Sequence, residues 1–327
     1  MRRTFLIFAV SGLLASTPFS HLSAELGRDW VEVTASAPWA HRYYHTATAF
    51  GPKIILAGGQ GGGDGWYTAD GAKWVRIPGD VRWSFRWGHT ALVFNKKMWV
   101  LGGYGAEEMN DVWCSSDGLH WTSVTMHVRW PTRYLHSSVV HDGKMWVLGG
   151  IHQSLGPRND VWYSTNGTTW TCATARTPFV MADWCDAVAH AGKIWVLGSI
   201  GVWSSTNGTS WTLVSAHPPW LDPLWRFSPK AIVCDGRIWV IGGKDYFTMG
   251  QQSVWSSADG VDWQMATRYA YCTGRVGHAL AVFNGKLWLL GGLDPGYKGQ
   301  DPKLFNDVWY SAILMRPTSA TTWTRYP

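Results

Sequence analysis

Four Arg-x-x-His elements recur along the 327-residue chain and carry side chains suited to ligand binding or catalysis. They are Arg42/His45, Arg86/His89, Arg133/His136 and Arg275/His278, and Arg226 stands in a further copy without its histidine. A guanidinium group binds carboxylates through paired hydrogen bonds, so five arginines around one opening would attract an anionic ligand. A residue that every copy repeats is also typical of architecture, where it bonds carbonyls of the adjacent copy. The sequence leaves both interpretations open.

Aromatic and acidic side chains near these elements complete a candidate site. Aromatic rings beside arginine can stack on a sugar or anchor a protein partner. The candidate ligand-binding residues are Arg42, Arg86, Arg133, Arg226, Arg275, Trp87, Tyr104, Trp184, Trp225 and Tyr246, with Trp130, Trp220 and Tyr297 nearby. The acids available for proton transfer are Asp183, Asp186, Asp222, Asp245, Glu107 and Glu108. No spacing selects one acid, so the catalytic residues stay unassigned.

A repeated pair of hairpins must position these residues. A strand ending in two small residues recurs six times, at Gly59, Gly103, Gly150, Ser199, Gly243 and Gly292. Turns such as Asp142-Gly143 precede these strands and suit two-residue hairpins, because both turn residues take positive φ. A second hairpin follows, with tryptophans eight residues apart on its strands, as at Trp162 and Trp170.

A ring of such units buries faces that one unit would leave exposed. The sequence therefore predicts an all-β fold, a six-bladed β-propeller whose blades each contain four antiparallel strands, a to d. A buried tryptophan removes about 150–250 Å² from water, so we expect most of the 25 tryptophans to pack between blades. Residues 25–327 are expected to form this single domain.

The repeat resembles that of the kelch family, in which Arg-x-x-His, a hairpin, Gly-Gly and a downstream Trp follow one another. The resemblance covers about residues 30–323. Kelch relatives include copper-radical galactose oxidases, iron-dependent specifier proteins, sialic acid mutarotases and many protein-binding modules. The resemblance therefore implies a propeller and leaves the function open.

The metal-dependent relatives match this chain poorly. A copper site would need a Cys–Tyr pair, a second Tyr and two His, and Tyr271-Cys272 and His278 are near each other in sequence only. The specifier pattern spaces Glu, Asp and His by four residues. Glu107 and Asp111 match it, but Ser115 stands where His is needed. We therefore expect no metal and no other cofactor.

One strand of the last blade is expected to come from the N-terminus. The d-like segments number seven, against six copies of the other strands. Trp30 precedes His45 by 15 residues, as Trp74 precedes His89. Trp30 thus belongs to a d strand of the blade before blade 1, which in a ring is blade 6. The segment around Trp323 is then a supplementary edge strand.

Loop lengths vary most on one face of the expected ring. Strands alternate in direction, so the b–c and d–a connections share that face. The spacing from the second small residue to the next tryptophan, which spans the b–c connection, is 7 residues at Gly59–Trp66 but 17 at Gly292–Trp309. Blade 4 has the shortest connection and replaces Arg-x-x-His by residues 182–185. Variation on a rigid scaffold indicates a functional face.

The N-terminus is typical of a secretory signal peptide. Arg2 and Arg3 precede an apolar run over residues 4–15, and small residues follow near residue 24. The apolar run is too short to span a bilayer. We expect residues 1–24 to direct the protein to the periplasm or outside the cell, with no membrane span. Removing both arginines lowers the net charge from +6 to +4, which makes no case for nucleic acid.

The five cysteines are far apart and form no Cys-x-x-Cys motif. We expect buried structural cysteines rather than a zinc or redox site, although an oxidising compartment would permit disulfides.

Together these features predict a secreted, monomeric propeller that binds a protein or a glycan through its b–c and d–a loops. The alternative is a sugar-acid isomerase, similar to the mutarotases, with an arginine-lined channel mouth.

Overall fold

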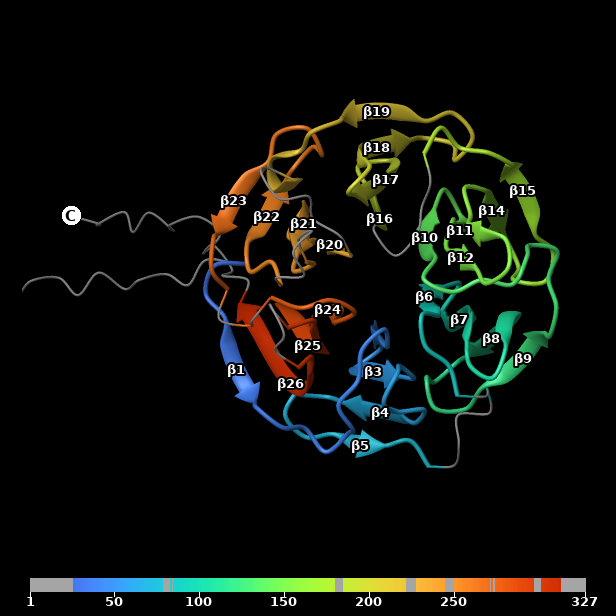
Figure 1. Ribbon diagram of the computed structural model, residues 1–327. Coiled ribbons are helices and arrows are strands. Elements are labelled where there is room, and N and C mark those ends of the chain that lie inside the picture. Colours follow the sequence, from blue (N-terminus) through green and yellow to red (C-terminus); the bar gives the residue numbers. More distant parts are fainter. Residues whose placement is uncertain are drawn as a thin grey trace, which may run out of the picture.

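The computed structural model describes residues 26–78, 83, 85–179, 185–221, 228–244, 250–270, 272, 274–296 and 301–312. Within these ranges, six four-stranded antiparallel sheets form a ring (Figure 1). The all-β, six-bladed propeller expected from the repeat is confirmed. The a strands line the centre of the ring and the d strands form its rim (Figure 1).

The blades follow one another along the chain. Blade 1 contains β2 (Thr46–Phe50), β3 (Lys53–Ala57), β4 (Gly65–Thr68) and β5 (Val75–Arg76). Blade 2 contains β6 (Thr90–Phe94), β7 (Lys97–Tyr104), β8 (Glu108–Ser115) and β9 (Thr122–Thr125). Blade 3 contains β10 (Ser137–His141), β11 (Lys144–Leu148), β14 (Val161–Ser164) and β15 (Thr171–Thr174), with a small hairpin of β12 (Ile151–His152) and β13 (Gly156–Pro157).

The second half of the ring repeats this order until the last blade. Blade 4 contains β16 (Cys185–His190), β17 (Lys193–Gly198), β18 (Gly201–Ser205) and β19 (Thr212–Ser215). Blade 5 contains β20 (Lys230–Cys234), β21 (Arg237–Ile241), β22 (Val254–Ser257) and β23 (Gln264–Thr267), preceded by the short 3-10 helix η1 (Pro219–Leu221). Blade 6 contains β24 (Ala279–Phe283), β25 (Lys286–Asp294), β26 (Lys303–Ala312) and the N-terminal β1 (Val31–Thr34).

The a–b turns have the conformation that their sequences require. Asp142 and Gly143 have φ of 48° and 65°, and Asn284 and Gly285 have 49° and 66°. Two successive positive φ values match the twist of the strands they join. These turns fix the register in which each a strand pairs with its b strand, as in His141 opposite Lys144.

The core consists of six apolar clusters, each between two adjacent blades. A glycine in a c–d turn lies against a b-strand tryptophan of the preceding blade. A Cβ atom on Gly208 would come within 2.1 Å of the Trp146 ring, and one on Gly260 within 2.3 Å of Trp195. Only glycine allows this approach, so these turns and tryptophans join neighbouring blades.

The N-terminal strand closes blade 6 as predicted. β1 pairs with β26 and is the outermost strand of that sheet. Gly27 takes the place of a c–d turn glycine: its N–H bonds Ser311 Oγ at 2.8 Å, as Gly167 bonds Ser164. Trp30 Nε1 donates to the Gly27 carbonyl at 3.0 Å. The ring is therefore closed by a turn whose two sides come from opposite ends of the chain. The segment around Trp323 lies outside the described residues.

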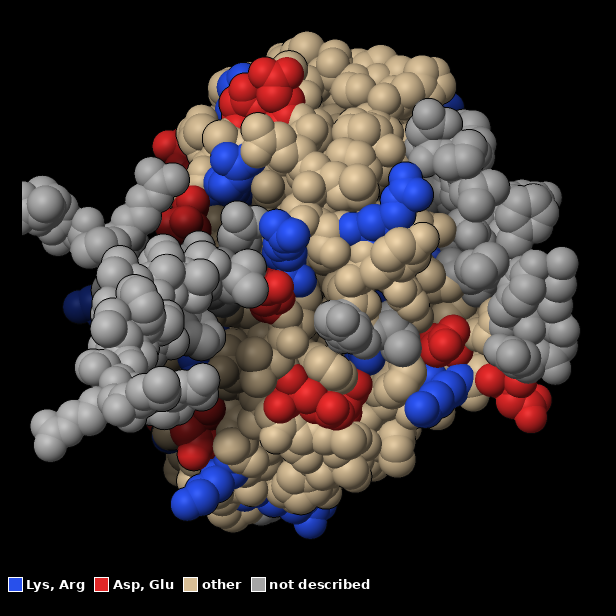
Figure 2. All heavy atoms as spheres, turned by 90° about the vertical axis from the view of Figure 1, so that its left-hand side faces the viewer, with Lys and Arg blue, Asp and Glu red and all other residues tan. Residues whose placement is uncertain are grey.

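The surface beside β1 and β23 carries both signs of charge, interspersed among uncharged residues (Figure 2). In the part of the chain that the structure describes, no helix has the length and apolar character to cross a bilayer.

Candidate functional site at the channel mouth

The four described arginines of the Arg-x-x-His elements are buried inside their own blades. Arg133 donates to Asp160 Oδ1 and Oδ2 at 2.8 Å each and to the Gly149 carbonyl at 2.7 Å. Arg86 and Arg275 bond Asp111 and Asp307 in the same paired manner. Arg42 contacts Asp64 at 2.6 Å. Each arginine thus ties the d–a connection to strand b and to the start of strand c.

A tryptophan completes this network. Trp162 Nε1 donates to Asp160 Oδ2 at 2.8 Å, so that carboxylate is bonded on both oxygens. Burial alone would raise the pKa of Asp160, but the hydrogen bonds and charge of Arg133 outweigh it, and the pKa is lowered. Burial lowers the pKa of Arg42, although Asp64 opposes the shift. The pairs compensate charges that would be costly if left alone.

These contacts favour the architectural interpretation of the arginines over direct ligand binding. The exposed fraction of Arg42, Arg86, Arg133 and Arg275 is between 0% and 1%. Blade 4 has lost both partners together, since Ala182 and Gly201 stand where blades 1, 2, 3 and 6 have Arg and Asp, and blade 5 has Ser253 in place of the Asp. Arg226 lies outside the described residues.

A cavity of about 200 Å³ lies where the a strands meet at the channel. The residue after the histidine position lines it in every blade: Thr46, Thr90, Ser137, Asp186, Lys230 and Ala279. Blades 1 to 3 thus contribute three hydroxyl groups, whereas blades 4 to 6 contribute the carboxylate of Asp186, the ammonium group of Lys230 and an alanine. The cavity is asymmetric even though the scaffold repeats.

The hydroxyls bond across the blade boundaries. Thr46 Oγ1 is 3.1 Å from His89 Nε2, and Thr90 Oγ1 is 2.9 Å from His136 Nε2. Ala279 has no hydroxyl for His45, and neither ring nitrogen of His45 has a hydrogen-bond partner among the described residues. Burial lowers the pKa of His89 to about 3, so its ring is neutral at pH 7.

Asp186 and Lys230 form the charged side of the cavity. Lys230 Nζ is 3.6 Å from Asp186 Oδ2. Asp186 also accepts from Ser137 Oγ at 3.2 Å and from the backbone N–H of Ala231 at 3.0 Å. The carboxylate therefore joins blades 3, 4 and 5 around the channel.

Five aromatic residues form a continuous cluster beside this cavity on the b–c and d–a face; we call it the mouth cluster. Its members are Tyr43, Tyr44, Trp87, Tyr104 and Tyr134, all half-buried. The Trp87 ring lies 5.9, 5.4 and 5.1 Å from the rings of Tyr44, Tyr104 and Tyr134. Tyr44 also lines the cavity, so the cluster and the channel form one site.

Tyr44 and Leu135 hold unusual backbone conformations at this mouth. Their φ angles are 54° and 53°, at the position where two other blades have Gly88 and Gly277. The Tyr44 N–H donates to the Gly277 carbonyl at 2.7 Å, and the Leu135 N–H donates to Gly88 at 2.7 Å. A bulky residue with positive φ costs about 1–2 kcal/mol. Such strain is concentrated at functional sites.

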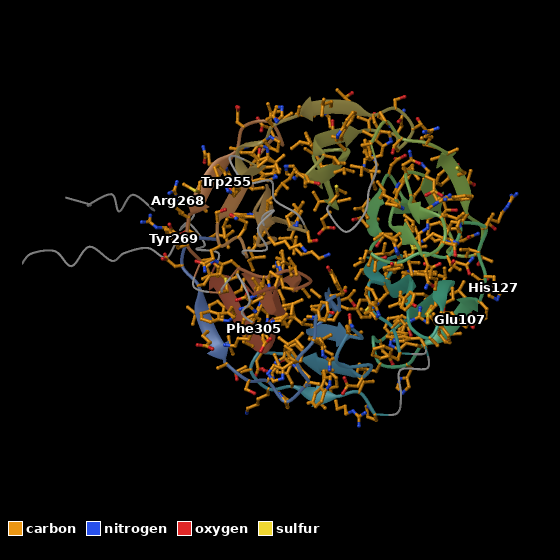
Figure 3. All side chains as sticks on the ribbon, viewed as in Figure 1. Glu107, His127, Trp255, Arg268, Tyr269 and Phe305 are labelled. Atoms are coloured by element: carbon orange, nitrogen blue, oxygen red, sulfur yellow. The ribbon has the colours of Figure 1, made fainter. Side chains whose placement is uncertain are left out.

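Of the candidate ligand residues, the structure brings Trp87 and Tyr104 together. Trp184, Trp225, Tyr246 and Tyr297 lie outside the described residues, as do Asp183, Asp222 and Asp245. Trp130 and Trp220 belong to the core between blades. Glu107 is exposed and lies over blade 2, away from the ring centre (Figure 3). Glu108 accepts from Thr132 Oγ1 at 3.0 Å.

The sequence analysis missed Tyr43, Tyr44, Tyr134, Lys230 and the channel hydroxyls. A signal was available: in blades 1 to 3 the first residue after Arg is aromatic, whereas in blade 6 it is Val276. Cys185, Cys234 and Cys272 are buried, as the sequence predicted, whereas Cys114 is half-buried and Cys172 is exposed. No disulfide joins the five, all of which are described, and burial raises the pKa of the Cys272 thiol to about 12.

Comparison with known proteins gives information on the fold alone. No protein-family description matches the chain, and no curated protein matches it in sequence. The solved structure of YjhT is similar in fold, with a TM-score of 0.66 and 15% sequence identity. The match covers 85% of this chain and 96% of YjhT. This similarity supports the six-bladed propeller and assigns no activity to it.

Proposed function

We propose that the protein is a carbohydrate-binding propeller that binds one glycan end at the mouth cluster and the channel. The observation that carries this proposal is the continuity of five half-buried aromatic rings with a hydroxyl-lined cavity. Aromatic faces pack on the C–H faces of a sugar, and hydroxyls exchange hydrogen bonds with it.

A glycan suits the site better than a protein partner does. The cavity of about 200 Å³ is smaller than the about 300–1,000 Å³ of a pocket for a drug-sized ligand, so it takes one small group. Thr46, Thr90 and Ser137 make its wall polar, whereas an apolar anchor side chain would need a dry pocket. A sugar hydroxyl can use the remaining hydrogen-bonding capacity of these three groups.

The sugar-acid isomerase is the second candidate, and it rests on Asp186. Asp186 is the one acid among the described candidates that lines the cavity. It accepts hydrogen bonds from Ser137, Ala187 and Ala231, which hold the carboxylate in place. This arrangement suits a positioning role better than a proton-transfer role, so we favour binding.

The kelch relationship and secretion through the N-terminal leader belong to this proposal. The repeated Arg-x-x-His, small-residue pair and Trp support the former, and Arg2, Arg3 and the apolar run support the latter. A binding function outside the cell suits a face of variable loops on a rigid ring.

The test is a thermal-shift screen of the mature chain against neutral and acidic monosaccharides and oligosaccharides. A ligand that binds only the folded state raises the melting temperature. We expect at least one sugar class to do so, and Trp87→Ala to abolish the shift while Tyr269→Ala keeps it. Tyr269 is 69% exposed on the outer rim of blade 5 and serves as the matched control (Figure 3). The absence of a shift with every sugar would reject the proposal.

A further inference from the structure

Lys230 is the only cation among the six residues that open the a strands. It begins β20 and lines the cavity with its side chain 39% exposed. Apart from Asp186, the groups beside it at this level are hydroxyls and an alanine. The ammonium group thus lies at a polar cavity, where charge interactions are less screened than on the outer surface.

Asp186 already accepts hydrogen bonds from three donors. It accepts from Ser137 Oγ, the Ala187 N–H and the Ala231 N–H at 3.2, 2.9 and 3.0 Å. Its 3.6 Å separation from Lys230 Nζ is a charge contact longer than a normal hydrogen bond. Among the described residues, none accepts a hydrogen bond from Lys230, so no described acceptor occupies its three N–H donors.

Other groups around the cavity also favour an anion. Burial lowers the pKa of His45, His136 and His278, and the positive charge of Lys230 lowers it further. These rings therefore stay neutral. His45 is buried, lines the cavity and has no partner on either ring nitrogen among the described residues. A neutral imidazole supplies one N–H donor.

We propose that Lys230 binds a carboxylate of the ligand, so that the channel selects an acidic sugar over its neutral counterpart. This inference rests on the proposed glycan-binding function and names the chemical class of its ligand. Asp186 cancels part of the positive charge, so the site suits a singly charged carboxylate better than a phosphate dianion. Asp186 thereby acts as a positioning residue that holds the ammonium group toward the cavity.

The experiment compares ligands that differ only in the carboxylate. Methyl β-D-glucuronide and methyl β-D-glucoside are titrated by calorimetry into wild type, Lys230→Gln and Lys97→Gln. Lys97 is exposed at the a–b turn of blade 2, on the opposite face, and is the matched control. Acetate is titrated as a carboxylate without a sugar, and melting temperatures report the folding of each variant.

We expect wild type and Lys97→Gln to bind the glucuronide at least tenfold more tightly than the glucoside. Lys230→Gln should bring this ratio to about one by weakening the binding of the glucuronide and not that of the glucoside. Acetate should bind wild type but not Lys230→Gln. Equal binding of the two sugars by wild type would overturn the inference and leave the proposed function intact. If acetate bound through Lys230 while neither sugar bound, the anion site would be supported and the proposed glycan-binding function would be rejected. An unchanged ratio in folded Lys230→Gln would also overturn the inference, and Lys230→Arg should restore the preference.

Discussion

Arg133 and Asp160 form a two-point hydrogen-bonded ion pair, 2.8 Å at each contact, between the d–a connection of blade 3 and its c strand. The exposed fraction of the two side chains is 0% and 7%. The same relationship recurs in Arg86–Asp111 and Arg275–Asp307. The repeated arginines thus hold the loops that form the mouth, and the groups that we propose to contact the ligand lie beside them.

Removing one member of this pair should destabilise the fold strongly. Arg133→Ala leaves Asp160 charged and buried, and breaking such a pair costs about 3–5 kcal/mol. The free energy of unfolding in urea measures this loss. Arg176→Gln, at an exposed position of blade 3, should change it by about 0.5 kcal/mol or less. A loss below about 1 kcal/mol in Arg133→Ala would show that the pair is not structural.

Stability should fall as the pH drops below about 6.5, because four histidines are buried in neutral form. Burial lowers the pKa of His45, His136 and His278 well below the usual value, and that of His89 to about 3. The unfolded chain binds protons first, so each histidine costs about 1.4 kcal/mol per pH unit from pH 6.5 down to its folded pKa.

Unfolding titrations between pH 7 and 5 measure this slope, above the range in which most carboxylates protonate. His89→Gln should reduce the slope, whereas His127→Gln should leave it unchanged, since His127 is exposed on blade 2 (Figure 3). A flat stability profile over this range would contradict the account of the buried histidines.

Tyr44→Gly should separate binding from stability. Glycine relieves the positive φ of 54° but loses a half-buried ring, so the free energy of unfolding should stay within about 1 kcal/mol of wild type. Affinity for the bound sugar should fall about tenfold or more, because a ring of the mouth cluster is lost. Urea unfolding and calorimetry measure the two effects. Unchanged affinity in the folded variant would remove Tyr44 from the site.

The closure of the ring should depend on Trp30 and Gly27. Trp30→Ala empties a buried site in the apolar cluster between blades 5 and 6 and should cost about 3–5 kcal/mol. Gly27→Ala places a Cβ within 2.2 Å of the Trp239 ring and should also destabilise. Val31→Ala, at an exposed position of β1, is the control. If thermal unfolding showed the three variants to be equally stable, β1 would not close the ring.

The fold was predictable because the signals of the repeat are local. The Asp142-Gly143 turn, the eight-residue spacing of Trp162 and Trp170 and the 15-residue spacing from Trp30 to His45 each follow from one hairpin or one connection. The six-fold repetition then leaves a closed ring as the arrangement that buries all blades.

The site was less predictable because it depends on which side chains of different strands and blades the closed ring brings together. The sequence position of Arg133 does not reveal its partner, because Asp160 is 27 residues away in sequence although the two side chains are 2.8 Å apart. Lys230 and Asp186 are ordinary surface charges by sequence, and their contact exists only because β16 and β20 are adjacent at the centre of the ring. The irregular blade 4 supplied Asp186, so the expectation that irregular blades carry the specificity agrees with the proposal.

The most direct test follows the indole N–H resonance of Trp87 in ¹⁵N-labelled protein while a sugar from the screen is added. Trp87→Phe assigns the signal, and Trp255, over blade 5 away from the ring centre, is the internal reference (Figure 3). Glycan binding at the channel mouth predicts a Trp87 shift that saturates with the calorimetric Kd while Trp255 stays fixed. Saturable sugar binding with an unmoved Trp87 would contradict the placement of the site.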